Sequence, residues 1–224
     1  MNKAIFWDSD GTLLYGNESF KCALMRAMQD AGVEPDEEAV GSLMRRICSW
    51  YAPEKDHSRL NGEEWWQELL KEIGHFCVEQ GIAPADTASV CASFRENVIT
   101  YEYEPYADAE MVLRTFQERG FSNYVISNNF PELELVFRRL GLDAYVSGYI
   151  LSASVGYEKP RKEIFACALR LAGNPETGYM IGDNPVADGQ GGLVAGLKPI
   201  LVHNRQEGMI CCDELTELLK IITE

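Results

Sequence analysis

The stretch that most constrains this chain lies near its start, where an apolar run ends in two carboxylates. Residues 4–7 are predicted to form a short buried strand, and Asp8-Ser9-Asp10-Gly11-Thr12 follows directly. In an open α/β sheet, functional groups lie where strands end and loops begin. Aspartates at positions i and i+2 leave such a strand end on the same side, close enough to share a cation. Asp, Ser and Gly also form ordinary turns, so the stretch alone leaves a plain turn as an alternative.

The composition narrows the classes of partner. The 224 residues can bury a full core, and they carry 20 Lys and Arg against 35 Asp and Glu, a net charge of −15. This acidic balance argues against a nucleic acid or an anionic membrane as the main partner, although a metal and a lysine can still capture a small anion. No apolar run reaches membrane-spanning length. Because the seven cysteines are irregularly spaced and a core strand begins at about the third residue, we expect reduced thiols and a cytoplasmic protein.

The residues from about 17 to 98 are predicted to be entirely helical. A first helix begins near Asn17 or Ser19, places apolar residues at positions i, i+3, i+4 and i+7, and ends at Gly32. Further helices are expected to begin at Pro35-Asp36, after Asn61-Gly62 and near Ala85. No segment of this block has the alternating pattern of a strand.

After residue 101 the pattern changes to alternating helices and strands. Strands are predicted at 123–126, 149–151, 178–181 and 198–202, and helices at 108–119, 131–140, 161–171, 188–195 and 213–221. This alternation implies a parallel, doubly wound sheet. The simplest organisation is an α/β Rossmann-like core domain of residues 1–16 and 99–224, with an all-helical cap domain of residues 17–98 inserted after the first strand.

Polar groups of a consistent kind follow the predicted core strands. Ser127-Asn128-Asn129 follows the strand at 123–126, Lys159 precedes Pro160, and Asp183 and Asp188 follow the strand at 178–181. Each could separately be a cap, a surface lysine or a turn. Because the carboxyl ends of parallel strands face one crevice, their common placement favours a single site. Carboxylates, a lysine and a Ser/Asn pair are what Mg²⁺ and a phosphate need together.

The motifs resemble those of the haloacid dehalogenase (HAD) superfamily, which consists mostly of Mg²⁺-dependent phosphatases. Residues 6–14 match its first motif, residues 126–128 its second, Lys159 its third and residues 182–188 its fourth. The helical block resembles the C1-type cap of the phosphatase branch that includes the phosphoglycolate phosphatases. The resemblance implies a Mg²⁺-dependent phosphomonoester hydrolase that acts on a small phosphorylated metabolite through an aspartyl-phosphate intermediate.

The resemblance also implies a role for each matching residue. Asp8 resembles the nucleophile that attacks phosphorus, and Asp10 the general acid and base that protonates the leaving oxygen and then activates water. Mg²⁺ would be held by Asp8, the main-chain carbonyl of Asp10 and Asp183. The phosphoryl group would be held by Ser127, the N–H of Asn128 and Lys159. Supporting positions would be Asp188, which holds Lys159 or a metal-bound water, together with Gly11, Thr12 and Asn184.

Other activities of the same superfamily are weighed against this one. A haloacid dehalogenase needs no leaving-group acid and no Mg²⁺, so Asp10 argues against it. A binding protein that had kept only the fold would have lost the nucleophile or a metal carboxylate, and this chain keeps both. A phosphosugar mutase or a 5'-nucleotidase shares the motifs and stays open. The departures from the family pattern, Ser9 and Arg161-Lys162, remove nothing that catalysis requires.

The cap should determine which substrate is bound, because the core contacts the phosphoryl group, which all phosphomonoesters share. Cap residues that could point toward the site are Arg45, Arg46, Trp50, Tyr51, His57 and Trp65. The plain interpretation of each is stronger: a solvated helix face for the arginines, a surface loop for the histidine and a helix core for Trp65. A cationic or aromatic lid would suit a small phosphorylated acid or a nucleotide. Whether the chain is a monomer or a homodimer is not encoded in these patterns.

Overall fold

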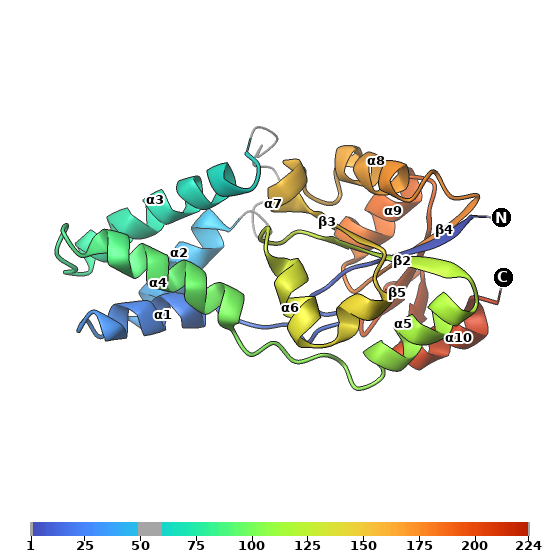
Figure 1. Cartoon of the computed structure of the whole chain (residues 1–224), viewed down its shortest axis with the longest axis horizontal. Coiled ribbons are helices and arrows are strands. Elements are labelled where there is room, and N and C mark those ends of the chain that lie inside the picture. The colour runs from blue at the N-terminus through green and yellow to red at the C-terminus, as the bar shows by residue number, and fades with distance from the viewer. Residues whose placement is uncertain (1, 49–59, 224) are drawn as a thin grey trace.

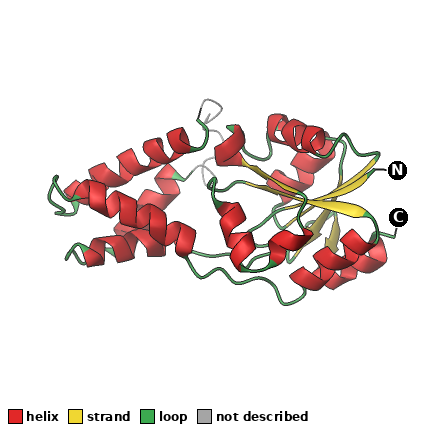
Figure 2. Ribbon diagram, in the orientation of Figure 1, coloured by secondary structure: helices red, strands yellow, loops and turns green. Residues whose placement is uncertain are grey.

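The computed structural model describes residues 2–48 and 60–223, and it places two differently built regions side by side (Figure 1). Strands occur only in the region at the right of Figure 2, where both chain ends lie, and the region at the left is built of helices. The expected α/β class is therefore confirmed. The left-hand helices are α1 (Ser19–Asp30), α2 (Glu37–Ile47), α3 (Glu63–Glu79) and α4 (Thr87–Thr100).

Within the described residues, six strands form one parallel sheet in the order β3-β2-β1-β4-β5-β6. The strands are β1 (Lys3–Trp7), β2 (Phe121–Ser127), β3 (Gly148–Leu151), β4 (Thr177–Gly182), β5 (Lys198–Val202) and β6 (Ile210–Cys212). The opening strand β1 is central, with Trp7 opposite Val125 of β2 and Ile181 of β4. The edge strand β6 was not expected, because three residues are too short to show an alternating pattern.

Helices cover both faces of the sheet. Ile5 and Trp7 of β1 belong to the larger core cluster, which includes α5, while Ala4 and Phe6 pack with α8 on the other face. Period-2 alternation along a strand produces this division, and it confirms the doubly wound arrangement. The helices around the sheet are α5 (Ala109–Glu118), α6 (Leu133–Arg139), α7 (Ser152–Val155), α8 (Lys162–Leu171), α9 (Gly191–Val194) and α10 (Leu218–Ile221).

Two helices expected near the C-terminal end are each divided into two segments of different helix type. The segment predicted as a helix at 188–195 begins as a π-helix, Pro185–Gln190, before α9. The side chain of Asn184 accepts hydrogen bonds from the N–H groups of Val186 and Ala187, so this helical segment begins before Asp188. The closing helix is likewise divided into a 3₁₀ turn, Leu215–Glu217, and α10; a further 3₁₀ turn, Leu142–Tyr145, was not expected.

The helices α1 to α4 pack together and meet the sheet region through aromatic rings. Phe20 of α1 stacks on Trp66 of α3 with ring centroids 6.3 Å apart, and it meets Phe94 of α4 edge to face at 5.9 Å. Phe130, which follows β2, lies 6.2 Å from Trp66 and is fully buried. This cluster holds the helical region against the turn after β2. The helix α4 runs on to Thr100, past the expected end, and the domain boundary near residue 98 stays a prediction.

A buried asparagine links the central strand to its neighbours and gives a first test of the fold. Asn123 of β2 accepts a hydrogen bond from Trp7 Nε1 at 3.0 Å and donates to the carbonyl oxygens of Leu113 and Tyr145 at 2.9 and 3.1 Å. Replacing it by Ala removes the acceptor of the buried indole N–H of Trp7 and one donor from each of the two carbonyl groups. Since one unsatisfied buried group costs about 1–3 kcal/mol, we expect Asn123→Ala to lower the free energy of unfolding by roughly 3 kcal/mol in urea titrations. An unchanged value would contradict this assignment.

Candidate active site

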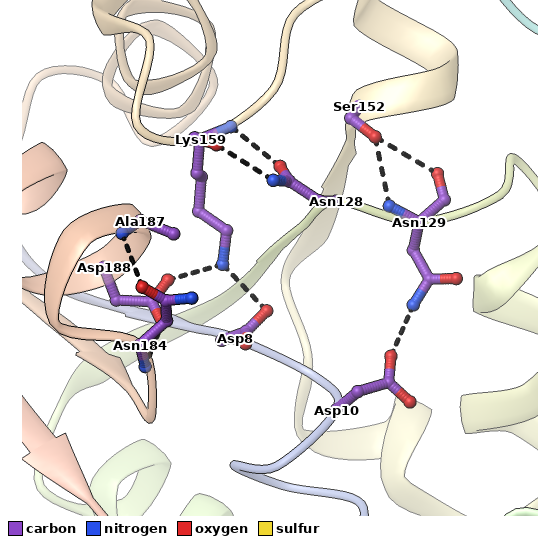
Figure 3. Close-up of polar contacts among 9 residues, drawn as sticks. All are labelled: Asp8, Asp10, Asn128, Asn129, Ser152, Lys159, Asn184, Ala187 and Asp188. Carbon is purple, nitrogen blue, oxygen red and sulfur yellow. Dashed lines mark hydrogen bonds and ion pairs between the residues drawn. The ribbon is translucent and has the colours of Figure 1, made fainter. Parts of the chain in front are cut away.

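The four predicted groups of polar residues meet at the carboxyl end of the sheet, as Figure 3 shows for most of them. Asp8 follows β1, Ser127 ends β2, and Asp183 follows β4. The main-chain N–H of Asp8 donates to the carbonyl of Ile181 at 2.8 Å, which ties the first loop to the fourth strand. The placement follows from the parallel topology, in which neighbouring strands end at one edge. Lys159 reaches this edge from the loop between α7 and α8.

Lys159 forms a buried ion pair with two aspartates. Its Nζ lies 2.8 Å from Asp8 Oδ1 and 2.6 Å from Asp188 Oδ1, and the residue is only 2% exposed (Figure 3). The other oxygen of Asp188 accepts the N–H of Asn184 at 3.0 Å. Burial alone would lower the pKa of Lys159, but attraction by Asp188 and Asp8 outweighs burial and raises that pKa. The lysine is therefore charged, and Asp188 holds it in place, one of the two alternatives expected.

Three carboxylates crowd together beside this single lysine. Ligand oxygens of Asp8, Asp183 and Asp188 all lie within 4.8 Å of one another. Burial, and then repulsion by Asp8, raises the pKa of Asp183 to about 6, although Lys159 opposes the rise. Burial also raises the pKa of Asp188, against the attraction of Lys159. A hard divalent cation bound by these oxygens would offset the excess negative charge, so the donor set fits Mg²⁺.

The close approach of two loops shapes this cluster. Gly11 has φ +81°, a conformation that favours glycine, and a Cβ there would overlap the carboxylate of Asp183. A Cβ on Gly182 would overlap the carboxylate of Asp188. At both positions the absence of a Cβ atom lets the main chain lie directly against an aspartate carboxylate. Thr12, expected to shape the first turn, is fully buried, and its hydroxyl has no hydrogen-bond partner within the described chain.

Asp10 is separated from this cluster by its own hydrogen bonds. Asn17 Nδ2 donates to its Oδ1, and Asn129 Nδ2 donates to its Oδ2, both at 2.6 Å. Burial, and then the charge of Asp8, raises the pKa of Asp10 to about 7, while the two amide donors oppose the rise. A carboxyl group with such a pKa can both give and take a proton near neutral pH. Asp8 and Asp10, two residues apart, therefore have different chemical surroundings.

The two asparagines after Ser127 have separate structural tasks. The side chain of Asn128 accepts from the N–H of Lys159 at 2.7 Å and donates to the carbonyl of Lys159 at 2.9 Å (Figure 3). Asn129 instead reaches Asp10. The motifs assign only the main-chain N–H of Asn128 to the site; they give no role there to its side chain or to Asn129, and the sequence pattern indicates for Asn17 only the start of a helix. The available signal is nearness to the motifs, because Asn129 directly follows the second motif and Asn17 lies three residues after the first.

A cavity of about 910 Å³ opens between these residues and the helical region. Its floor includes Asp8, Asp10, Ser127 and Lys159, and its helical side includes Phe20, Lys21, Glu37, Glu38, Gly41, Met44, Arg45 and Tyr103. Lys21 is paired with Glu18 and Glu37 at 3.3 and 2.7 Å. The site residues predicted from the motifs thus lie around one space large enough for a small organic phosphate.

The cap residues considered as substrate contacts separate into three groups. Arg45 lines the cavity. Arg46 does not line it and pairs with Glu72 at 3.1 Å, and Trp65 is buried against Trp66 with ring centroids 5.0 Å apart. For these two, the plain interpretation as surface and helix core is correct, because the periodicity of α2 and α3 turns them away from the site. Trp50, Tyr51 and His57 lie outside the described residues.

Comparison with known proteins identifies the family. A model of the haloacid dehalogenase-like hydrolases matches residues 2–196, which include every motif described above. The chain belongs to this family. It is accordingly a hydrolase of the HAD superfamily, and the resemblance seen in its motifs is confirmed.

Curated HAD relatives match most of the chain. A glyceraldehyde 3-phosphate phosphatase of Methanothermobacter thermautotrophicus is 30% identical over 217 residues, which cover 91% of this chain and 87% of the relative. The human haloacid dehalogenase-like hydrolase domain-containing protein 3 is 28% identical, with 91% and 83% covered. A phosphoserine phosphatase of Thermus thermophilus is 34% identical over 71% of this chain and 58% of its own length.

Solved HAD structures share the whole fold. A putative HAD hydrolase of Bacillus subtilis, crystallised with magnesium, superposes with a TM-score of 0.77 at 19% identity and covers 100% of this chain and 99% of its own. A 2-haloacid dehalogenase of Pseudomonas syringae superposes with a TM-score of 0.73, also at 19% identity, and the match covers 99% and 98% of the two chains. These likenesses establish the fold and not the reaction. In the part of the chain that the structure describes, no helix is both long and apolar enough to cross a membrane.

Proposed function

We propose that this HAD hydrolase is a Mg²⁺-dependent phosphomonoesterase that acts on a small phosphorylated metabolite. The observation that carries the proposal is the division between two nearby carboxyl groups. Asp8 lies against Lys159 and the acidic cluster, whereas Asp10 lies outside that cluster with a pKa raised to about 7. One group suits attack on phosphorus and the other suits proton transfer. Curated relatives named as phosphatases support the same activity.

The first chemical step would form a covalent intermediate on Asp8. A carboxylate oxygen of Asp8 attacks phosphorus, the bond from phosphorus to the leaving oxygen breaks, and Asp10 supplies a proton to that oxygen. In the second step a water attacks phosphorus, Asp10 takes a proton from the water, and the bond between Asp8 and phosphorus breaks. Inorganic phosphate leaves, and both aspartates return to their starting states.

The phosphoryl oxygens would be held by groups that already face the cavity. Lys159 is charged, fixed by Asp188, and anchored at its peptide by Asn128, so it offers a preorganised cation. Ser127 and the N–H of Asn128 would add neutral donors at the end of β2. Preorganisation matters because a phosphoryl transition state spreads negative charge over its oxygens, and donors that need no rearrangement stabilise that charge most.

Mg²⁺ would be held by the side chains of Asp8 and Asp183 and the main-chain carbonyl of Asp10. The carboxylate of Asp188 is a weaker candidate, because Lys159 and the N–H of Asn184 already occupy its two oxygens. When bound, the cation supplies charge neutralisation for the transferring phosphoryl group. The side chain of Asn184 keeps the turn that leads to Asp188 in shape, by accepting the N–H groups of Val186 and Ala187, and Thr12 would support the first turn.

The alternatives within the superfamily are less well supported by the site. A dehalogenase would not need an acid beside the nucleophile, and here Asp10 is held by two dedicated amide donors. A phosphosugar mutase would use the same core, and a 5'-nucleotidase would need room for a base. We favour a small metabolite because part of the cavity of about 910 Å³ is lined by charged residues of α2. The acidic net charge fits neither a nucleic acid nor an anionic membrane as partner.

Hydrolysis of generic aryl phosphates tests the proposal. With Mg²⁺ present, we expect the purified protein to release phosphate from p-nitrophenyl phosphate and from members of a panel of phosphorylated metabolites, because the core recognises the phosphoryl group. With EDTA, release should stop and should return when Mg²⁺ is added in excess. If no member of the panel were hydrolysed in Mg²⁺, the phosphatase assignment would be wrong. Release of halide from a 2-haloacid would support the dehalogenase alternative instead.

A further inference from the structure

Both oxygens of the Asp10 carboxyl group are held by asparagines from different parts of the fold. Asn17 lies between the first motif and α1, at the start of the helical region, and Asn129 lies in the turn after β2. Each Nδ2 lies 2.6 Å from one oxygen of Asp10. Figure 3 shows the contact with Asn129. The carboxyl group of Asp10 is therefore hydrogen-bonded from two sides: by Asn129 of the core and by Asn17 of the segment that leads into the cap helices.

The orientation of both amides follows from their other contacts. Asn17 Oδ1 accepts the N–H of Ser19 at 2.9 Å, and Asn129 Oδ1 accepts the N–H of Phe130 at 3.0 Å. A main-chain N–H can only donate, so each amide must present its oxygen to the backbone and its nitrogen to Asp10. Neither side chain can flip without losing both of its bonds.

Asn129 is itself anchored on a rigid element. Its N–H donates to the hydroxyl of Ser152 at 3.0 Å, and its carbonyl accepts the N–H of Ala153 at 3.3 Å, so α7 holds the turn (Figure 3). Both Asn129 and Ser152 are buried. The neighbouring Phe130 lies in the aromatic cluster beneath the helical region. The donor that reaches Asp10 is thus fixed by packing and by hydrogen bonds, as a positioning group requires.

We propose that Asn17 and Asn129 are positioning residues, which hold the carboxyl group of Asp10 in the plane and direction needed to protonate the leaving oxygen. The inference rests on the proposed phosphatase function. An Asp side chain can rotate about its χ1 and χ2 torsions unless contacts fix them. A misplacement of about 1 Å can cost about 100-fold in rate, and two donors on two oxygens remove that freedom.

The dependence of the rate on the leaving group distinguishes a positioning role of Asn17 and Asn129 from other roles. p-Nitrophenolate leaves readily without a proton, whereas phenolate and alkoxides need one. Asn129→Ala and Asn17→Ser should therefore lower kcat/KM for phenyl phosphate and glycerol 2-phosphate by about 10- to 100-fold, which is part of the roughly 100- to 10,000-fold that general-acid catalysis contributes. For p-nitrophenyl phosphate the loss should be much smaller. In Asn17→Ser, the hydroxyl can still accept the N–H of Ser19, so the start of α1 is kept.

The matched control is Asn97→Ala. Asn97 of α4 donates to the carbonyl of Ala23 at 3.3 Å, far along the chain from the motifs, and does not line the cavity. This variant loses an asparagine bond of the same kind, and it should leave the ratio of kcat/KM between phenyl and p-nitrophenyl phosphate as in the wild type. Thermal unfolding of all three variants, and Mg²⁺ titration by calorimetry, should show a folded protein with unchanged metal affinity.

The possible outcomes test the role of the two asparagines separately from the proposed phosphatase function. A wild type that hydrolyses none of these phosphates overturns the proposed function, and the inference with it. An active wild type with variants that lose rate equally for all leaving groups shows a structural or substrate-binding role and overturns the inference alone. A rise in KM with unchanged kcat would do the same, because the asparagines would then bind substrate directly. A steeper dependence on the leaving group in both variants supports the inference.

Discussion

Replacing Asp8 by Asn is expected to abolish phosphate release while the protein stays folded. The amide cannot act as the nucleophile, so no phosphoryl group can be transferred to the protein. Loss of a covalent nucleophile costs many orders of magnitude elsewhere, and we expect kcat to fall by at least about 1,000-fold. Phosphate release from p-nitrophenyl phosphate, measured with saturating Mg²⁺, checks this.

The fold should tolerate this change because Asn keeps the contact with Lys159. Asp8 Oδ1 accepts from Lys159 Nζ, and an amide oxygen can accept in the same place. The substitution also removes one of the three clustered carboxylates, and Lys159 keeps its ion pair with Asp188. In EDTA, relief of repulsion should leave the midpoint of thermal unfolding unchanged or raised. A lowered midpoint would show that Asp8 also has a structural role.

Lys159→Met is the control that shows whether the loss of activity in Asp8→Asn comes from the chemistry or from a loss of stability. It removes the partner of two buried carboxylates, so it should lower both activity and stability, since breaking a buried pair costs about 3–5 kcal/mol. If Asp8→Asn lost stability as Lys159→Met does, its loss of activity could not be assigned to chemistry. Circular dichroism and thermal unfolding of both variants decide between the two cases.

The sequence was sufficient to predict the arrangement of the sheet edge and the acids on it. Asp8, Ser127, Lys159 and Asp183 each follow a core strand or its loop, and parallel topology brings such positions together without any knowledge of side-chain contacts. The continuous apolar run of residues 4–7 likewise predicted a buried strand, and β1 is buried on both faces. These features depend on local patterns and on a topology rule, which is why one chain is enough to predict them.

The partners of Asp10 could not be predicted in the same way. Asn17 reads as the start of a helix, and its side-chain oxygen does accept the N–H of Ser19, the first residue of α1, but its amide nitrogen also reaches Asp10. Asn129 follows a motif residue by two positions and reaches Asp10 from another strand. Such contacts depend on how loops that are distant in the sequence lie relative to one another. The periodicity of apolar residues contains no information about that arrangement.

Mg²⁺ binding should distinguish Asp183 from Asp10, although both are acidic and face the same cavity. The carboxylate of Asp183 lies within the acidic cluster, and in the described chain no other residue donates a hydrogen bond to it, so it is free to bind a cation. The side chain of Asp10 is held by two amides, and only its main-chain carbonyl is assigned to the metal. We therefore expect Asp183→Asn to weaken Mg²⁺ binding by about tenfold or more, and Asp10→Asn to change it little.

Isothermal titration of Mg²⁺ into each variant measures this difference without relying on turnover. Asp10→Asn should still lose phosphatase activity, because an amide cannot donate and accept the proton in turn. The two variants thus separate metal binding from proton transfer: one loses the cation and activity together, and the other keeps the cation and loses activity alone. If Asp10→Asn weakened Mg²⁺ binding as much as Asp183→Asn, the Asp10 carboxylate would itself be a metal ligand. The asparagines that hold it would then position a ligand and not an acid.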